Sequence, residues 1–234
     1  YNYFYKNDGL QNQWVVFRQK ADLPAEVFLD PNTFSSDGTT SLAGLQFSED
    51  GSIAAYAISE GGSDWRKVRI INSESKQQLE PELVDVKFSG IAWRGNTGFF
   101  YSSYDKPDGS ELSAKTDQHK LYFHRLGTAQ ADDQLIFGGS AEEKPRYVGA
   151  DVTDDGQYLV VSATNTTSGN KLFVKKLSDP ASVFVALDDE GSADYELIDS
   201  RGDRLFFKTN FNAPNQRLIA VDMNTPSQDR WIDI

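Results

Sequence analysis

The sequence predicts an all-β fold made of repeated four-stranded antiparallel modules, the architecture of a β-propeller. Segments rich in β-branched and aromatic residues occur along the whole chain, and Gly, Asp, Asn and Ser separate them. No segment shows a convincing helical period; residues 141–144 come nearest, but they are few and precede Pro145. A tight turn opens an apolar strand at intervals of roughly 45 to 60 residues, about the length of one propeller blade.

Each repeat has the same four parts in the same order. A short strand leads into the tight turn, a strand with a buried character follows it, a third strand mixes polar and apolar residues, and a short outer strand closes the module. Asp and Gly tolerate positive φ, so the turns are predicted to be two-residue type I′ hairpins. The turns are Asp50-Gly51, Gly95-Asn96, Asp155-Gly156 and Arg201-Gly202-Asp203. The clearest strand candidates are residues 14–17, 52–58, 67–71, 99–101, 120–124, 158–162, 171–174, 205–208 and 217–221.

These modules predict one domain rather than two. Residues 1–234 form a single partial propeller with about five blades, and the first of them is incomplete. The approximate blades are residues 1–43, 44–88, 89–140, 146–189 and 193–234. Because the sequence opens inside a strand-like run without an initiator Met, we expect it to be a piece of a longer chain.

Composition narrows the classes of partner. The net charge of −12 disfavours nucleic acid and anionic membranes, and no apolar run approaches the ~18 residues that cross a bilayer. The sequence has no Cys, which excludes disulfides and thiolate chemistry and fits a reducing compartment. A cytoplasmic location is therefore expected, with the bacterial periplasm as the alternative.

Several segments, in order along the whole chain, carry a resemblance to a known family. They are "GLQNQ", "VFLDPN", "FSEDG", "GGSDW", "VKFSGIAW" and "FKTNFNAPNQRLIAVDM". The sequence resembles the propeller domain of the prolyl oligopeptidases, serine peptidases of the S9 family. "GLQNQ" together with "VFLDPN" is more specific than general propeller patterning.

The resemblance implies a seven-bladed parent propeller above an α/β-hydrolase domain that cleaves short peptides after proline. This chain would supply about the first five blades, and the hydrolase domain of the same full-length chain would be its partner. The propeller would act as a gate that excludes large polypeptides. No cofactor is implied. The alternative is a non-catalytic propeller scaffold for peptide or protein binding.

The resemblance also implies three residues that line a substrate pocket. Phe88 of "VKFS" matches a position that contributes an apolar wall, and Val148 of "PRYVGA" matches a family methionine. Asp64 matches the acid of the "GSDW" segment, but the position of its usual arginine partner falls near Thr164, which puts that ion pair in doubt. Ordinary packing between blades is the alternative for Phe88 and Val148.

Ser63 is interpreted as part of a turn and not as a nucleophile. A hydrolase elbow has the form G-x-S-x-G between a strand and a helix, whereas position 65 is Trp and a strand follows. The two histidines, His119 and His124, belong to one candidate strand and would project to opposite faces, without a recognisable catalytic triad.

No metal site is expected. Two histidines without Cys do not match zinc spacings, and the Asp105–Glu111 segment lacks the regular ligands of a calcium loop. The acidic run Asp188-Asp189-Glu190 is interpreted as a solvated turn. Asn165-Thr166-Thr167 matches a glycosylation sequon but is interpreted as a polar loop.

Overall fold

The computed structural model describes residues 1–105, 117–140 and 144–234, which form antiparallel sheets joined by turns. The chain divides into two compact units, Tyr1–Phe47 with Gly51–Lys87, and Ser48–Asp50 with Phe88–Ile234. Residues 141–143 of the weak helical candidate lie outside the described residues. Across the described ranges, no helix has the length and apolar character needed to span a membrane.

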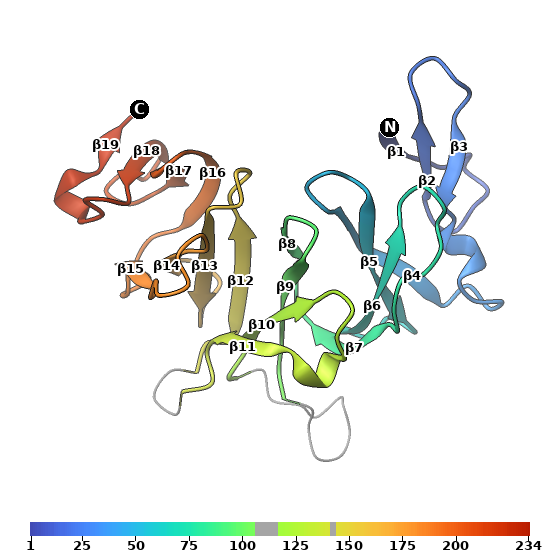
Figure 1. Ribbon diagram of the computed structural model, residues 1–234, viewed down its shortest axis with the longest axis horizontal. Helices are drawn as coiled ribbons and strands as arrows, with labels where there is room; N and C mark the ends of the chain where they lie inside the picture. Colours follow the sequence, from blue (N-terminus) through green and yellow to red (C-terminus); the bar gives the residue numbers. More distant parts are fainter. Residues whose placement is uncertain (106–116, 141–143) are drawn as a thin grey trace. The chain divides into compact units, whose positions relative to one another are not determined.

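The first unit contains two sheets in which consecutive strands lie side by side (Figure 1). The first sheet has three strands: β1 (Asn2–Lys6), β2 (Val15–Gln19) and β3 (Glu26–Leu29). The 3-10 turn η1 (Pro31–Thr33) then leads to the second sheet. That sheet has four strands: β4 (Thr40–Phe47), β5 (Ile53–Glu60), β6 (Trp65–Asn72) and β7 (Leu83–Lys87).

The second unit contains three four-stranded meanders. The third sheet has β8 (Ala92–Arg94), β9 (Gly98–Ser103), β10 (Lys120–Arg125) and β11 (Gln134–Phe137), with η3 (Gln130–Asp132) between the last two. The fourth sheet has β12 (Tyr147–Val152), β13 (Tyr158–Thr164), β14 (Lys171–Lys176) and β15 (Val185–Asp188). The fifth has β16 (Tyr195–Arg201), β17 (Arg204–Thr209), β18 (Arg217–Asp222) and, after η4 (Gln228–Arg230), β19 (Ile232–Asp233). The all-β prediction and the four-stranded antiparallel repeat are confirmed.

Strand β13 shows why the second strand of a module reads as a continuous apolar run. Successive side chains of a strand point to opposite faces of its sheet. Tyr158 and Val160 join a core shared with the fifth sheet, and Leu159 and Val161 join a core shared with the third sheet. Because both faces are covered, every one of these positions is apolar. Side-chain packing, not strand pairing, therefore joins neighbouring sheets in this unit.

The two sheets of the first unit pack in the same way and are also joined by a polar contact. Val16 and Phe28 from the first sheet share a buried core with Tyr56 and Ile58 from the second. This core is rich in rings, which supply large apolar areas in a short strand.

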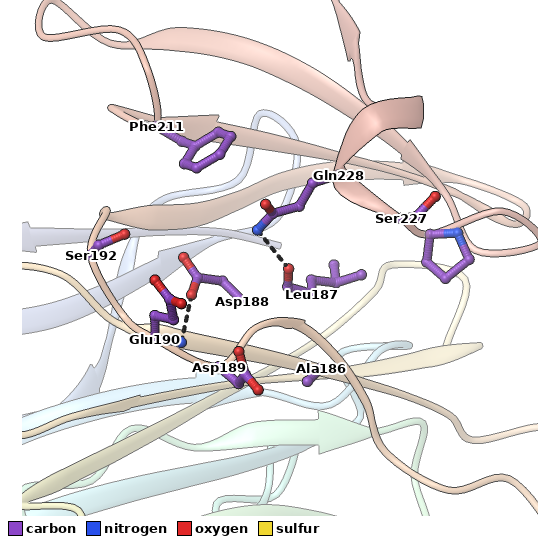
Figure 2. Close-up of a pocket in the computed structure, with 10 residues that line it drawn as sticks. Ala186, Leu187, Asp188, Asp189, Glu190, Ser192, Phe211, Ser227 and Gln228 are labelled. Carbon is purple, nitrogen blue, oxygen red and sulfur yellow. Dashed lines mark hydrogen bonds between the residues drawn. The ribbon is translucent and has the colours of Figure 1, made fainter.

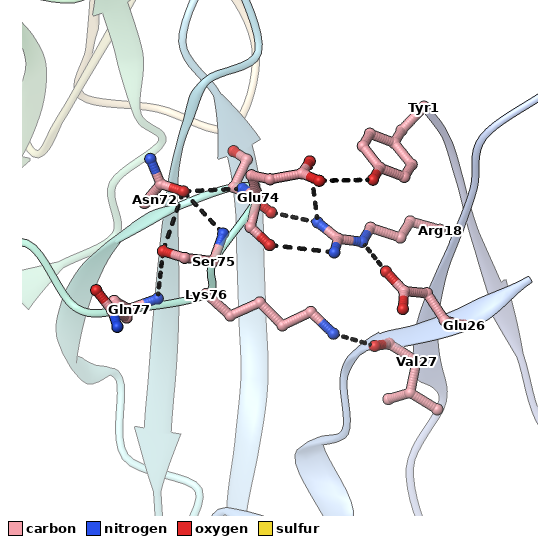
Figure 3. Close-up of polar contacts among 10 residues, drawn as sticks. Tyr1, Arg18, Glu26, Val27, Asn72, Glu74, Ser75, Lys76 and Gln77 are labelled. Atoms are coloured by element: carbon pink, nitrogen blue, oxygen red, sulfur yellow. Dashed lines mark hydrogen bonds and ion pairs between the residues drawn. The ribbon is translucent and has the colours of Figure 1, made fainter.

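The polar contact is a clasp formed by Arg18, Glu26, Ser73 and Glu74 (Figure 3). Arg18 on β2 is only 5% exposed, and its guanidinium donates to the backbone oxygen of Ser73 and, at 3.1 Å, to that of Glu74. Its Nε donates to Glu26 Oε1 at 2.5 Å. Hydrogen bonds from a charged donor are stronger than neutral ones, so the clasp fixes the turn after β6 against the first sheet.

The third and fourth strands share a register irregularity in three of the four-stranded modules, and not between β18 and β19. A shift in pairing occurs between β6 and β7, between β10 and β11 and between β14 and β15. The same shift occurs between β2 and β3. Shifts also occur between first and second strands, in β4 with β5 and in β16 with β17, so the irregularity alone does not place β1 to β3 within a module. The first sheet is the incomplete one, and β4 of the second sheet begins at Thr40, earlier than the boundary predicted at residue 44.

The type I′ prediction for the repeated turns is wrong. Positive φ occurs only at their glycines, and neither Asp50, Asn96 nor Asp155 shares it. At the third turn, the Gly156 N–H donates to Thr153 O at 2.7 Å, which closes a four-residue turn. The first three loops are longer than two residues, whereas Arg201 pairs with Arg204 at the fourth turn and leaves a two-residue loop. Each turn has one left-handed residue, which Gly supplies without steric cost. These glycines are Gly51 (φ 72°), Gly95 (53°), Gly156 (67°) and Gly202 (58°).

Candidate functional site

An aromatic rim lies in the second unit, where the chain leaves β7 and enters the third sheet. Phe88 is half-buried and has φ of 50°, a left-handed conformation that a bulky residue rarely adopts. Its ring meets the edge of Tyr147 at 5.6 Å and that of Tyr104 at 6.3 Å between centroids. An unusual backbone held in place by its surroundings often marks a functional position. We call Phe88, Tyr104 and Tyr147 the aromatic rim.

Buried polar contacts fix Tyr104 and the residues next to Tyr147 in place. The Tyr104 hydroxyl donates to the backbone oxygen of Arg146, and its ring stacks on that of His119 at 4.3 Å. His119 is fully enclosed, and its Nδ1 accepts the Val148 N–H at 2.8 Å. Burial also raises the pKa of Tyr104 above its ordinary value, so the hydroxyl stays a donor at neutral pH. The start of β12 is therefore fixed against the third sheet.

Because side chains alternate along β12, Val148 and its neighbour Tyr147 lie on opposite faces of the sheet. Val148 is 2% exposed and belongs to the core between the third and fourth sheets. Tyr147 is 37% exposed, and it is Tyr147 that meets Phe88. Sequence reasoning missed Tyr147, although period-two alternation in "RYVGA" could have indicated it. The structure thus brings the Phe88 ring and the Val148 segment together through Tyr147.

Asp64 belongs to the first unit and is exposed in the turn between β5 and β6. Gly61 and Gly62, with φ of 59° and 74°, reverse the chain before it. The Ser63 hydroxyl accepts the Trp65 N–H at 3.1 Å, and Ser63 O accepts the Ser59 hydroxyl at 2.7 Å. The interpretation of Ser63 as a turn residue is confirmed.

Thr164, near which an arginine partner for Asp64 would fall, ends β13 in the second unit. Its hydroxyl donates to the backbone oxygen of Gly169 at 2.8 Å and accepts the Thr166 N–H at 3.2 Å. Asn165 beside it is exposed, and its side-chain oxygen accepts the Arg146 N–H at 2.9 Å. The sequon residues therefore lie in a polar loop closed by its own hydrogen bonds.

The second histidine forms an acid–histidine pair that the sequence did not reveal. His124 Nδ1 lies 2.7 Å from Asp133 Oδ1, and the Tyr101 hydroxyl donates to Asp133 Oδ2 at 2.8 Å. His124 is 1% exposed and packs against the Phe99 ring at 5.5 Å between centroids. Such a pair forms two parts of a catalytic triad. Here it is enclosed inside the third sheet, where it supports packing and cannot reach a substrate.

The acidic run lines a pocket of about 520 Å³ beside the fifth sheet (Figure 2). Asp189 and Glu190 are exposed, as a solvated turn requires, but Asp188 is only 5% exposed. The Asp188 carboxylate accepts the N–H groups of Glu190 and Gly191 at 2.8 and 2.9 Å, and the Tyr195 hydroxyl at 2.9 Å. The turn therefore has one buried carboxylate whose hydrogen bonds shape the loop.

No group of three or more His, Cys, Asp or Glu side chains within residues 1–105, 117–140 and 144–234 is arranged to hold a metal ion. The segment compared with a calcium loop, Asp105–Glu111, lies outside the described residues except for Asp105. Asp105 itself pairs with Lys120 at 2.5 Å.

Comparison with known proteins gives one consistent result. Residues 1–234 match the family model for the prolyl oligopeptidase N-terminal beta-propeller domain. The chain is 52% identical to a prolyl endopeptidase of Elizabethkingia miricola, over 100% of the chain and 33% of that protein. It is 33% identical to prolyl oligopeptidase A of Galerina marginata, over 94% of the chain and 34% of that protein. The chain thus spans about a third of the length of these relatives.

Solved structures agree with the sequence matches. A structure from a study of two prolyl endopeptidases superposes with a TM-score of 0.87 at 32% identity, covering 99% of this chain and 33% of that one. Prolyl oligopeptidase B of Galerina marginata, bound to a 35mer substrate, superposes with a TM-score of 0.86 at 28% identity, covering 99% and 35%. Both similarities extend over nearly the whole chain.

Proposed function

Because the chain belongs to the prolyl oligopeptidase family, as an N-terminal β-propeller domain, we propose that it is the gate of a peptidase. It would restrict large polypeptides from a separate serine-peptidase active site, which cleaves short peptides after proline. Its partner would be the α/β-hydrolase domain of the same full-length protein. The cytoplasm is the proposed location, and cell fractionation would test it.

The observation that carries this proposal is the enclosure of both histidines. The sequence has two, and the structure leaves them 0% and 1% exposed, each with its ring engaged in packing and hydrogen bonds. A general base must come within hydrogen-bond reach of the proton that it removes. The chemistry of a serine peptidase would therefore be performed by another part of the protein.

A gate must also resist being pushed open, and the sheets are suited to this. Strand pairing stays within each sheet, and side-chain packing joins neighbouring sheets within each unit. Protein interiors of this kind are close-packed and deform little. Excluding water and large chains would assist a reaction elsewhere without contributing a reacting group.

The aromatic rim supports a second part of the proposal, in which Phe88 and the Val148 segment line the substrate pocket. Phe88 and Tyr147 offer partly exposed rings, to which an apolar residue near a scissile proline could bind. Asp64 would contribute a carboxylate. Replacing Phe88 with Ala should raise KM for short peptides more than it lowers kcat, because the ring would contact substrate remote from the reacting bond.

The test compares this chain with the longer gene product that contains it. A short blocked Gly-Pro amide should be hydrolysed by the longer protein only. The same Gly-Pro site placed in a folded protein should be cleaved far more slowly. Hydrolysis by the 234-residue chain alone, or equal rates on both substrates, would contradict the proposal.

A further inference from the structure

A groove between the third and fourth sheets is unlike the rest of the chain in charge. Its volume is about 450 Å³, within the usual range of small-ligand sites, and all its lining residues belong to the second unit. Its lining includes the last residues of β8, β10 and β14. We call it the basic groove.

Basic side chains outnumber acidic ones in the basic groove, although the sequence holds 35 acidic and 23 basic residues. Its four cations are Arg94, Arg125, Lys175 and Lys176, and its two acids are Asp132 and Asp179. Among these cations, Lys176 is paired with a carboxylate, Asp203 at 2.8 Å. Within the described part of the chain, the other three have no carboxylate partner at ion-pair distance. In a protein of net charge −12, such a concentration of positive charge attracts anions locally.

Arg94 is held in a fixed orientation. One of its Nη atoms donates to the backbone oxygen of Leu177 at 2.9 Å, and the guanidinium lies 5.9 Å from the Phe123 ring centroid. A guanidinium has five N–H donors, so others remain for a ligand. Because its position is already fixed, binding would cost little further side-chain entropy.

Arg125 and Lys175 both line the basic groove. Arg125 is exposed at the end of β10, and the Lys175 ammonium lies 5.6 Å from the Phe184 ring centroid. A carboxylate between them would replace water at both cations. Guanidinium groups can bind a carboxylate through two parallel hydrogen bonds.

The floor of the basic groove is apolar. Phe123 and Ile136 are partly exposed and supply its accessible apolar surface. Behind them lie Phe100, Leu159 and Leu177, which are buried in the same core. A small inorganic anion would use the cations and leave this surface uncovered. A wholly apolar ligand would leave the cations without a partner. The chemistry therefore favours a ligand with an apolar body and an anionic end.

We propose that the basic groove binds the C-terminal residue of a peptide, with an apolar side chain on the floor and the free carboxylate between Arg125 and Lys175. Small organic acids also combine an apolar body with a carboxylate, and they are the alternative ligands for the basic groove. This site is separate from the aromatic rim, and its occupancy does not depend on the peptidase gate.

The experiment is an NMR or calorimetric titration of the 234-residue chain with N-acetyl-L-phenylalanine, its C-terminal amide and acetate. The acid should show saturable binding, and the amide and acetate should each bind about fivefold or more weakly, as expected for loss of one exposed ion pair or of the apolar contact. Raising the ionic strength should weaken binding of the acid and of acetate, and should leave binding of the neutral amide unchanged. Equal binding of the acid and the amide would overturn the proposal.

Charge variants locate the site. Arg125→Glu and Lys175→Glu should each weaken binding of the acid by about fivefold or more, since each removes an ion pair and adds repulsion. Arg201→Glu makes the same charge change at an exposed position that does not line the groove, and it should leave binding unchanged. No effect of the first two variants, or an equal effect of all three, would overturn the proposal.

A last titration distinguishes peptide C-termini from small organic acids as ligands of the basic groove. A tripeptide acid ending in Phe should bind more tightly than 3-phenylpropanoate, because the peptide backbone adds contacts along the opening. Equal or tighter binding of phenylpropanoate would overturn the assignment to peptide ends.

Discussion

Replacing Arg18 with Met is expected to destabilise the first unit strongly. The clasp brings a guanidinium that is only 5% exposed against two backbone oxygens of the turn after β6 and against Glu26. Methionine keeps an apolar stem of similar length, so the packing over the neighbouring rings is largely preserved. The change therefore isolates the hydrogen bonds and the charge.

The size of the effect follows from the partners. A hydrogen bond to a charged group contributes about 1.5 to 3 kcal/mol. Two carbonyls lose such a donor, while the bond to Glu26 counts for little because the Glu26 side chain is 54% exposed. Water can reach the exposed Glu74 and recover part of its loss. We expect the free energy of unfolding to fall by about 3 kcal/mol.

Urea unfolding followed by circular dichroism and tryptophan fluorescence measures this change. Lys67→Met is the matched control, because Lys67 on β6 pairs with Glu60 at 2.9 Å and both side chains are partly exposed. It should cost under about 1 kcal/mol. A loss for Arg18→Met no larger than that of the control would show that the clasp does not join the two sheets.

Three further changes test other parts of the structure. His124→Ala should lower the unfolding free energy by about 3 kcal/mol, because the carboxylate of Asp133 stays buried without its imidazole partner. A loss below about 1 kcal/mol in a urea titration would contradict this role of the His124–Asp133 pair. Asp151 is an exposed residue, but partial desolvation and then the Glu196 carboxylate raise its pKa, so stability falls as pH rises through the range in which only the unfolded chain has lost this proton. Asp151→Asn should therefore raise Tm slightly at neutral pH and leave it unchanged in acid, and the opposite pattern would be evidence against this pKa shift. Gly169→Ala should prevent native folding or lower the unfolding free energy by about 3 kcal/mol or more, since the new Cβ would lie 2.2 Å from a backbone oxygen at φ of 76°. The control Gly156→Ala, at φ of 67° in open space, should lower it by about 1 kcal/mol. Equal thermal shifts for the two variants would contradict this steric difference.

The sequence predicted strands well where both faces of a strand are buried. Residues 158–162 and 205–208 lie inside β13 and β17, because continuous apolar runs bounded by turn residues have few alternatives to a covered strand. Turn type was predicted poorly. Asp-Gly marks a reversal, but it does not reveal whether the loop has two residues or, as at Thr153–Gly156, a longer turn with one left-handed glycine.

Contacts between strands explain what the sequence could not reveal about the candidate site. The family motif indicated Val148, but the partly exposed ring beside Phe88 is that of Tyr147, and the alternation of β12 decides which of the two neighbours faces the core. The pairing of His124 with Asp133 depends on how the chain returns after β10. No local sequence pattern indicates how the loop after β10 folds back, so the contact between His124 and Asp133 could not be predicted from their spacing.

We propose that this chain limits the size of substrates, and a ratio of rates tests the proposal most directly. In the longer gene product, kcat/KM is measured for a short blocked Gly-Pro peptide and for a long unfolded polypeptide with the same site, with and without Arg18→Met. We expect a strong preference for the short peptide, which decreases when the clasp is removed because the long chain gains access. Equal kcat/KM values for the two substrates in the unaltered protein would contradict it.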